Sequence, residues 1–239
     1  MSRVAAEEVV ALGGENSSIE SYPNREVELG NISVWRALPI RERRMVGPWC
    51  FLDRFGPHTF QNEKPMDIAP HPHIGLQTVT WLLEGETLHN DSLGYEVLLR
   101  AGGVNVMTSG SGIAHAEQTP SKNSGQLNGA QLWVALPDAD RNIDATLQHL
   151  PEVPRLEHAG GVTQVFAGAI GDAVSPAHHF SDIVGADIAL HAGHPLPLPL
   201  NTAHEHAILL MNGDCELEGQ RLQPNMLYYV PQGRSDLRL

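Results

Sequence analysis

The sequence predicts an all-β fold, and three observations carry that prediction. The 239 residues include 23 glycines and 17 prolines, which are scattered among short apolar runs. Those runs are rich in β-branched residues, as in LQTVTWLL at 76–83. Few long stretches follow the 3.6-residue period of an amphipathic helix. Short strands joined by turns satisfy all three observations.

The first quarter of the chain predicts a tail followed by strands. Residues 1–24 are mixed and small, and are interpreted as an N-terminal tail. The run VELGNISVWRALP at 27–39 alternates well enough for two short strands about a turn at Gly30 and Asn31. A basic cluster follows, either a solvated strand edge or a positive rim that steers an anionic substrate; its members are Arg41, Arg43, Arg44 and Arg54.

The middle of the chain predicts a loop, a strand and a glycine-rich turn. The polar, proline-containing FQNEKPMDIAP at 60–70 is typical of a loop, and LQTVTWLL is typical of a strand. EGETLHNDSLG at 84–94 would supply a turn and a returning strand. Four glycines in 102–115 allow tight backbone turns before His115. QLWVALPDADRN closes this first series at residue 142.

A second series of short strands is expected after a linker with one short helical turn. Glycine-bearing turns again separate the apolar runs, and LLEG and LMNG align the two halves weakly. We expect the second half to be metal-free, and either to be truncated or to close with fewer strands, using the N-terminal tail. The predicted division is a tail (1–24), a first domain with a metal site (25–142), a linker (143–161) and a second domain (162–239).

Charge and cysteine content exclude several classes of function. The formal net charge is −13, which repels nucleic acid and anionic lipid. Cys50 and Cys215 are far apart and form no CxxC motif, so inert thiols in a reducing compartment are expected. The sequence shows neither a secretory signal nor an apolar run of the roughly 20 residues that span a bilayer. A cytoplasmic protein without membrane or direct nucleic-acid partners is the prediction.

Two short-spaced pairs of potential ligands predict a metal site. His71 and His73 form one pair, and His115 and Glu117 form the other. Alternate residues of a strand share a face, so each pair would point the same way. Three imidazoles and one carboxylate suit a first-row divalent cation, and leave up to two open positions on an octahedral ion. Fe(II) is the expected metal, while Ni, Co, Mn, Cu and Zn fit the same donors.

The second half offers further histidines, but they fall out of register. Counting back from Gly85, His73 and His71 lie twelve and fourteen residues earlier. The same count from Gly213 reaches Asn201 and Pro199, neither of which replaces an imidazole. His204 and His206 remain an alternative minor site for Zn or Ni.

Several blocks in order resemble the pirin family of the cupin superfamily. These are RRMVGPWCFLDRFGP, PHPHIGLQTVTWLLEG, HNDSLG, MTSGSGIAHAE and QLWVALP, between Arg43 and Pro137. The resemblance implies a bicupin, which is two antiparallel β-barrel (jelly-roll) domains in one chain. It also implies that Glu117 supplies the carboxylate ligand. Many relatives carry Glu at the position of Gln77, so Gln77 is expected to hold a ligand or bound molecule by hydrogen bonds.

The resemblance implies a quercetin 2,3-dioxygenase (quercetinase) that opens a flavonol with O2 and releases carbon monoxide. Glu117 would then be the catalytic base as well as a ligand. Apolar side chains beside the metal would hold the aromatic substrate. The expected pocket residues are Phe51, Gln77, Trp81, Met107 and Trp133. Pirins also resemble non-enzymatic regulators that bind a protein partner according to the redox state of the iron. A Zn or Ni isomerase fits the ligands but not the sequence blocks.

Overall fold

The structure is a computed structural model that describes residues 11–12, 19–29, 32–61 and 66–239. Strands are the regular elements of these residues, and no helix occurs among them, as predicted. The predicted turn at Gly30 and Asn31 and part of the predicted loop lie outside the described residues. Within the described part of the chain, no helix has the length and apolar character needed to cross a bilayer.

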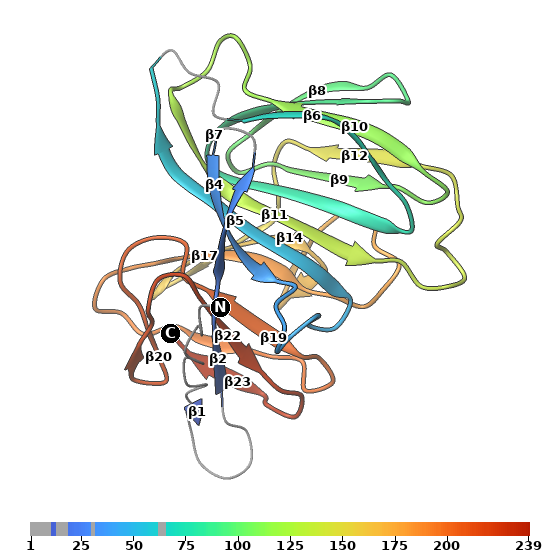
Figure 1. Cartoon of the computed structure of the whole chain (residues 1–239). Helices are drawn as coiled ribbons and strands as arrows, with labels where there is room; N and C mark the ends of the chain where they lie inside the picture. Colours follow the sequence, from blue (N-terminus) through green and yellow to red (C-terminus); the bar gives the residue numbers. More distant parts are fainter. Residues whose placement is uncertain (1–10, 13–18, 30–31, 62–65) are drawn as a thin grey trace, which may run out of the picture.

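The first half forms a ten-stranded antiparallel sheet that curls over itself (Figure 1). Its main path runs β12-β9-β7-β11-β5-β4-β3, while β10 pairs with β6 and β7, and β8 pairs with β7. The bounds are β3 Arg25–Leu29, β4 Ile32–Leu38, β5 Trp49–Thr59, β6 Asp67–His73, β7 Leu76–Asp91, β8 Glu96–Arg100, β9 Val104–Thr108, β10 Ile113–Gln118, β11 Gln126–Ala135 and β12 Thr146–Leu150.

Strand β7 is the longest element and joins the two faces of this barrel. Residues 76–85 pair with β9 and β11, whereas residues 86–91 pair with β8 and β10. Gly85 lies at the change of partners with a φ of +89°, and a Cβ there would come 2.1 Å from Gln126 O. Only glycine fits this close approach. The turn expected within residues 84–94 is therefore preceded by a corner at Gly85 inside β7. The returning strand β8 starts only at Glu96.

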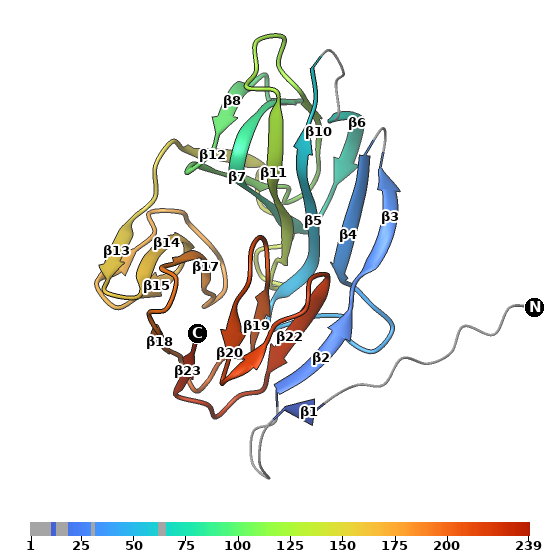
Figure 2. The same ribbon diagram turned by 90° about the vertical axis from the view of Figure 1, so that its left-hand side faces the viewer.

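The second half consists of small sheets packed below the first in the view of Figure 2. One sheet is β13-β14-β17, and another is β1-β2-β22-β19. Short two-stranded sheets complete the second half. The bounds are β1 Ala11–Leu12, β2 Ile19–Pro23, β13 Arg155–His158, β14 Gly161–Ala167, β15 Ala169–Ile170, β16 Ala173–Val174, β17 Gly185–Leu190, β18 Pro197–Pro199, β19 His206–Leu209, β20 Glu216–Leu217, β21 Gln220–Arg221, β22 Met226–Val230 and β23 Asp236–Arg238.

Two segments differ from the sequence prediction. Part of the segment expected to be a tail is strand β2, and its pairing with β22 through residues 20–23 agrees with the expected use of the tail to close the second half. The expected linker with a helical turn instead contains β12, which pairs with β9, and β13. Both segments find their partners at long sequence distance, which local propensity does not reveal. The domain boundaries themselves stay predictions.

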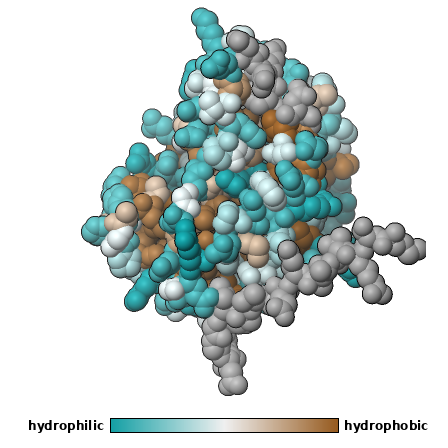
Figure 3. All heavy atoms as spheres, turned by 60° about the vertical axis from the view of Figure 1, so that its left-hand side comes forward, coloured by the Kyte–Doolittle hydropathy of each residue, from teal (hydrophilic) through white to brown (hydrophobic). Residues whose placement is uncertain are grey.

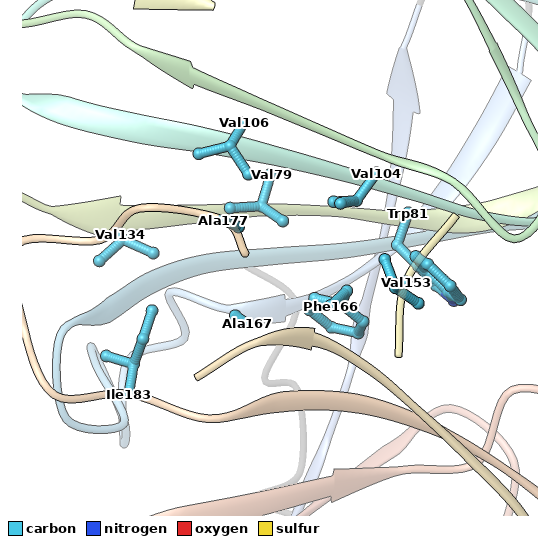
Figure 4. Close-up of a cluster of buried hydrophobic side chains, with 10 residues drawn as sticks. All are labelled: Val79, Trp81, Val104, Val106, Val134, Val153, Phe166, Ala167, Ala177 and Ile183. Carbon is cyan, nitrogen blue, oxygen red and sulfur yellow. The ribbon is translucent and has the colours of Figure 1, made fainter. Parts of the chain in front are cut away.

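An apolar cluster fills the space between the two halves. Val79 and Trp81 on β7 and Val104 and Val106 on β9 point toward Phe166 and its neighbours on the other side (Figure 4). The Trp81 and Phe166 rings are stacked with centroids 5.1 Å apart. Burial of such side chains is the main favourable term in packing the halves.

Two arginines of the basic cluster contact the second half of the chain. Arg43 lies 3.4 Å from the centroid of the Tyr229 ring, which belongs to β22. Arg54 donates a hydrogen bond from Nη1 to Asn225 Oδ1 at 3.1 Å. These two part-buried cations therefore have structural contacts with the second half, which neither interpretation of the cluster predicted. On the face shown in Figure 3, polar residues cover most of the surface, with smaller apolar groups between them.

Candidate metal site

Three imidazoles meet inside the first-half barrel. The ligand atoms of His71, His73 and His115 all lie within 4.8 Å of one another. The Nε2 atoms of His71 and His115 are 3.1 Å apart. Among the described residues, this is the one group of three or more potential metal ligands brought so close.

Strand register explains why these residues meet. His71 and His73 alternate on β6, and β6 pairs with β10 so that His71 lies opposite His115. The turn into β10 depends on Gly110, which has a φ of +47°. A Cβ on Gly110 would lie 2.0 Å from Ile143 O, so the turn requires glycine. The glycine-rich approach to His115 that the sequence predicted is therefore present.

Burial keeps two imidazoles of the cluster, His73 and His115, neutral at physiological pH. His73 and His115 are only 8% and 3% exposed. Burial, together with the neighbouring imidazoles, lowers the pKa of His73 to about 4 and that of His115 to about 3. Neutral imidazole is the form that binds metal ions, because its unprotonated nitrogen offers a lone pair.

The hydrogen bonds of His71 fit a metal ligand. His71 Nδ1–H donates to the carbonyl oxygen of Ala69 at 2.9 Å, which leaves Nε2 without a proton. That Nε2 faces the other imidazoles. Three neutral nitrogen donors around one point fit a first-row divalent cation such as iron, nickel or zinc. The residues present thus suit the metal that the sequence predicted.

Glu117 is buried on the same strand as His115. Its side chain lies opposite His89 across the β10–β7 pair, and Thr80 Oγ1 is 3.1 Å from Glu117 Oε1. Burial raises the pKa of Glu117, while His89 and the Thr80 hydrogen bond oppose that shift. The carboxylate does not join the group within 4.8 Å of all three imidazoles. Its role as fourth ligand stays a prediction.

A hydrogen-bonded amide supports the Glu117 carboxylate through Thr80. Thr80 Oγ1 lies 3.0 Å from the side-chain amide of Gln131, but the hydroxyl has one proton to give. Gln131 Nε2 is buried without an acceptor in the orientation shown. Turning the amide by 180° lets Nε2 donate to Thr80, and Thr80 then donates to Glu117. This orientation satisfies both groups and fixes the carboxylate.

Three of the five predicted pocket residues lie in one row beside the cluster. The register places Met107 opposite Thr78, Thr78 opposite Trp133, and Trp133 opposite Phe51. The Trp133 and Phe51 rings stack with centroids 3.9 Å apart. Trp133 also meets the His73 ring edge-on at 5.0 Å between centroids. An aromatic wall therefore adjoins the candidate metal position.

The other two predicted pocket residues point to the opposite face of β7. Gln77 Nε2 donates to Thr108 Oγ1 at 2.9 Å and to the carbonyl oxygen of His178 at 3.1 Å. Trp81 packs on Phe166 and lines a cavity of about 870 Å³ whose other walls come mainly from the second half. No imidazole of the cluster lines that cavity. Alternation along β7 separates Gln77 and Trp81 from inward-facing Thr80.

The contact of Gln77 with His179 predicts an acid-sensitive link between the halves. His179 Nδ1 lies 2.9 Å from Gln77 Oε1, and burial lowers the pKa of His179 to about 4. The unfolded chain takes up this proton near pH 6.5, so the contribution to stability is present above that pH and is lost as the pH falls toward 4. The loss from pH 7 to pH 5 is about 2 kcal/mol.

His179→Gln keeps a donor for Gln77 and removes the titration. Urea unfolding of the metal-free protein at pH 7 and pH 5 should therefore show a smaller acid-induced loss in this variant than in the wild type. His178→Gln, at the exposed neighbouring ring, is the matched control. An equal loss in the wild type and in His179→Gln would contradict the assignment.

The second-half histidines have other contacts. His204 Nε2 lies 3.1 Å from Asp182 Oδ2, and His206 Nε2 lies 3.0 Å from the carbonyl oxygen of Asn201. Their ring centroids are 6.0 Å apart. That the second half holds no metal stays a prediction. Cys50 and Cys215 are free thiols, and burial raises the pKa of both.

Sequence reasoning missed three buried polar residues around the cluster. These are Thr80, His89 and Asp91 on β7. The block HNDSLG contained two of them, but a histidine and an aspartate two residues apart near a turn have no distinctive spacing. Their role follows only from the pairing of β7 with β10.

Comparison with known proteins identifies the family and agrees with the observed fold. The family model described as Pirin matches residues 31–134. A Pseudomonas aeruginosa protein, provisionally named as a quercetin 2,3-dioxygenase, is 42% identical over 211 residues, which are 88% of this chain and 66% of that protein. A pirin-like protein of Caulobacter vibrioides is 38% identical, with 88% of this chain and 75% of the relative covered.

Solved structures give the same picture. A quercetin 2,3-dioxygenase from Acinetobacter baumannii superimposes with a TM-score of 0.88 at 38% identity, covering 92% of this chain and 74% of that one. A bacterial pirin from Escherichia coli, solved in complex with nickel(II), shares the fold with a TM-score of 0.66 at 15% identity, covering 92% of this chain and 96% of that one. The structure is thus a cupin-type β protein with a three-imidazole site. The chain belongs to the pirin family.

Proposed function

We propose that the chain is an Fe(II)-dependent dioxygenase that opens a flavonol such as quercetin with O2. The observation that carries this proposal is the buried three-imidazole cluster beside both an acid and an aromatic wall. The names of the Pseudomonas and Acinetobacter relatives support the substrate class. Nickel fits the same donors and is the alternative metal.

The proposed roles of the residues are metal binding, substrate binding and proton transfer. His71, His73, His115 and Glu117 would hold the cation, which supplies Lewis acidity toward the flavonol 3-hydroxyl and access to O2 chemistry. Phe51, Trp133 and Met107 would hold the flat rings by stacking and exclude water from them.

Glu117 is the proposed base for the flavonol 3-hydroxyl. Its burial raises the pKa, so the carboxylate is a stronger proton acceptor than an exposed one. The hydroxyl of Thr80 orients Oε1, the oxygen to which it donates. Ring opening then places both atoms of O2 in the products and releases one carbon as carbon monoxide.

The test is anaerobic loading of the metal-free chain with Fe(II), followed by quercetin in air-saturated buffer. We expect the flavonol absorbance to decay with formation of one carbon monoxide per quercetin, and no decay without metal. Iron bound in a one-to-one ratio with quercetin untouched would contradict the enzymatic proposal. It would favour the regulatory alternative, in which binding of a protein partner depends on the redox state of the iron.

A further inference from the structure

A buried histidine–aspartate pair lies directly behind the metal-facing side of His115. His89 is 2% exposed, and the side chain of Asp91 is fully buried. Both lie on β7 at positions paired with β10, since His115 is opposite Asp91 and Glu117 is opposite His89. All four side chains therefore share the inward face of the barrel.

These groups form one chain of contacts. His115 Nε2 faces His71 Nε2 at 3.1 Å, and His115 Nδ1 faces His89 Nδ1 at 3.4 Å. His89 Nε2 lies 3.1 Å from Asp91 Oδ2. The other Asp91 oxygen, Oδ1, accepts the backbone N–H groups of Leu93 at 2.9 Å and Tyr95 at 3.2 Å.

The backbone contacts decide where each proton lies. Two N–H donors at Oδ1 stabilise an ionised Asp91, which can then only accept at Oδ2. His89 must therefore carry its proton on Nε2, and its Nδ1 offers a lone pair. The proton of His115 consequently lies on Nδ1, between the two rings. His115 Nε2 is left with a lone pair directed at the cluster.

We propose that Asp91 and His89 are positioning residues that hold the proton of His115 on Nδ1 and so present Nε2 to the cation. His71 reaches the same state more simply, because its Nδ1–H donates to the carbonyl oxygen of Ala69. The inference rests on the metal binding of the proposed function, but not on its oxidative chemistry.

Asp91→Asn is the decisive substitution because it reverses the direction of the hydrogen bonds that link His115, His89 and residue 91. The backbone N–H groups of Leu93 and Tyr95 require the amide oxygen at the Oδ1 position, so the amide N–H₂ must face His89 Nε2. His89 then carries its proton on Nδ1 and donates it toward His115 Nδ1. The proton of His115 moves to Nε2, where the cation would bind.

The first readout is the histidine tautomer in the metal-free protein. Nitrogen-15 labelling of the histidine rings and long-range proton–nitrogen correlation distinguish Nδ1–H from Nε2–H. We expect His115 as the Nδ1–H form in the wild type and as the Nε2–H form in Asp91→Asn. An Nε2–H form of His115 in the wild type would overturn the inference, whatever the variant does.

The second readout is the affinity for Co(II), measured by competition with a chelating dye. Asp91→Asn and His89→Phe should weaken it by about 10–100-fold, the usual effect of losing the partner of a ligating imidazole. Asp187→Asn, at a partly buried carboxylate on β17 in the second half, is the matched control and should stay within twofold of the wild type.

The two readouts separate this inference from the proposed function. Unchanged Co(II) affinity and an unchanged tautomer in Asp91→Asn would contradict the positioning role of Asp91 and His89, while leaving the metal site intact. A wild-type chain that binds no Co(II) would contradict the proposed metal site. The tautomer measurement would still test the positioning role of Asp91 and His89.

Discussion

Replacing His115 with alanine is expected to abolish metal binding at neutral pH. His115 contacts both other imidazoles of the cluster, with ring centroids 4.5 Å from His71 and 5.0 Å from His73. It is a direct donor, so its loss should exceed the roughly 10–100-fold effect expected for a supporting residue. Co(II) titration of the metal-free chain should therefore show affinity reduced by more than about 100-fold.

The matched control for this prediction is His149→Ala. His149 belongs to the same barrel, on β12, but its ring bonds Asn105 and not the cluster. This variant should bind Co(II) like the wild type. Equal losses in His115→Ala and His149→Ala would show that general destabilisation, and not loss of a donor, explains the effect.

Glu117→Gln is expected to lower turnover of quercetin by about 10²–10⁴-fold while iron stays bound. Glutamine has nearly the same shape and can still accept the hydrogen bond of Thr80, but it cannot take up the proton of the flavonol 3-hydroxyl. The three imidazoles remain to hold the cation. Iron content and steady-state turnover should be measured on the same preparation.

Glu96→Gln, an exposed carboxylate on β8, is the control for the loss of one negative charge. It should leave turnover unchanged. If Glu117→Gln retains both iron and full turnover, Glu117 is not the base. If it loses iron as well, the three imidazoles do not retain the cation without the Glu117 carboxylate, and the catalytic role of Glu117 must be tested separately.

The sequence predicted the all-β class and the approach of His71 and His73 to His115. His71 and His73 alternate on a strand, and glycine before His115 permits the turn that brings β10 beside β6. The two-residue period of a strand placed the members of each pair on one face, and glycine allowed the turn, whereas the resemblance to the pirin family implied that the two strands meet.

The supporting residues could not be predicted in the same way. Trp81 and Met107 are equally apolar in the sequence, yet Trp81 faces the second half and Met107 faces Thr78 in the barrel. Which face of a strand is inward depends on pairing register, and a shift of one residue exchanges the faces. Gln77 was assigned to the metal surroundings for that reason, whereas it contacts His178 and His179.

The sequence raised the use of the N-terminal tail to close the second half, but the partner strand and its register were out of reach. Residues 19–23 have no turn or repeat that links them to β22, which lies about two hundred residues later. Their partner is chosen by burial of Ile19 and Tyr22 in the second half. Such contacts are decided by tertiary packing and not by local propensity.

The measurement that tests the central claim most directly is a crystal structure of the Fe(II)-loaded protein with anomalous diffraction recorded at the iron edge. The account predicts one iron peak per chain, bonded to Nε2 of His71 and His115, to the His73 ring and to the Glu117 carboxylate. A peak at His204 and His206, or a fully loaded crystal with no peak inside the first-half barrel, would contradict it.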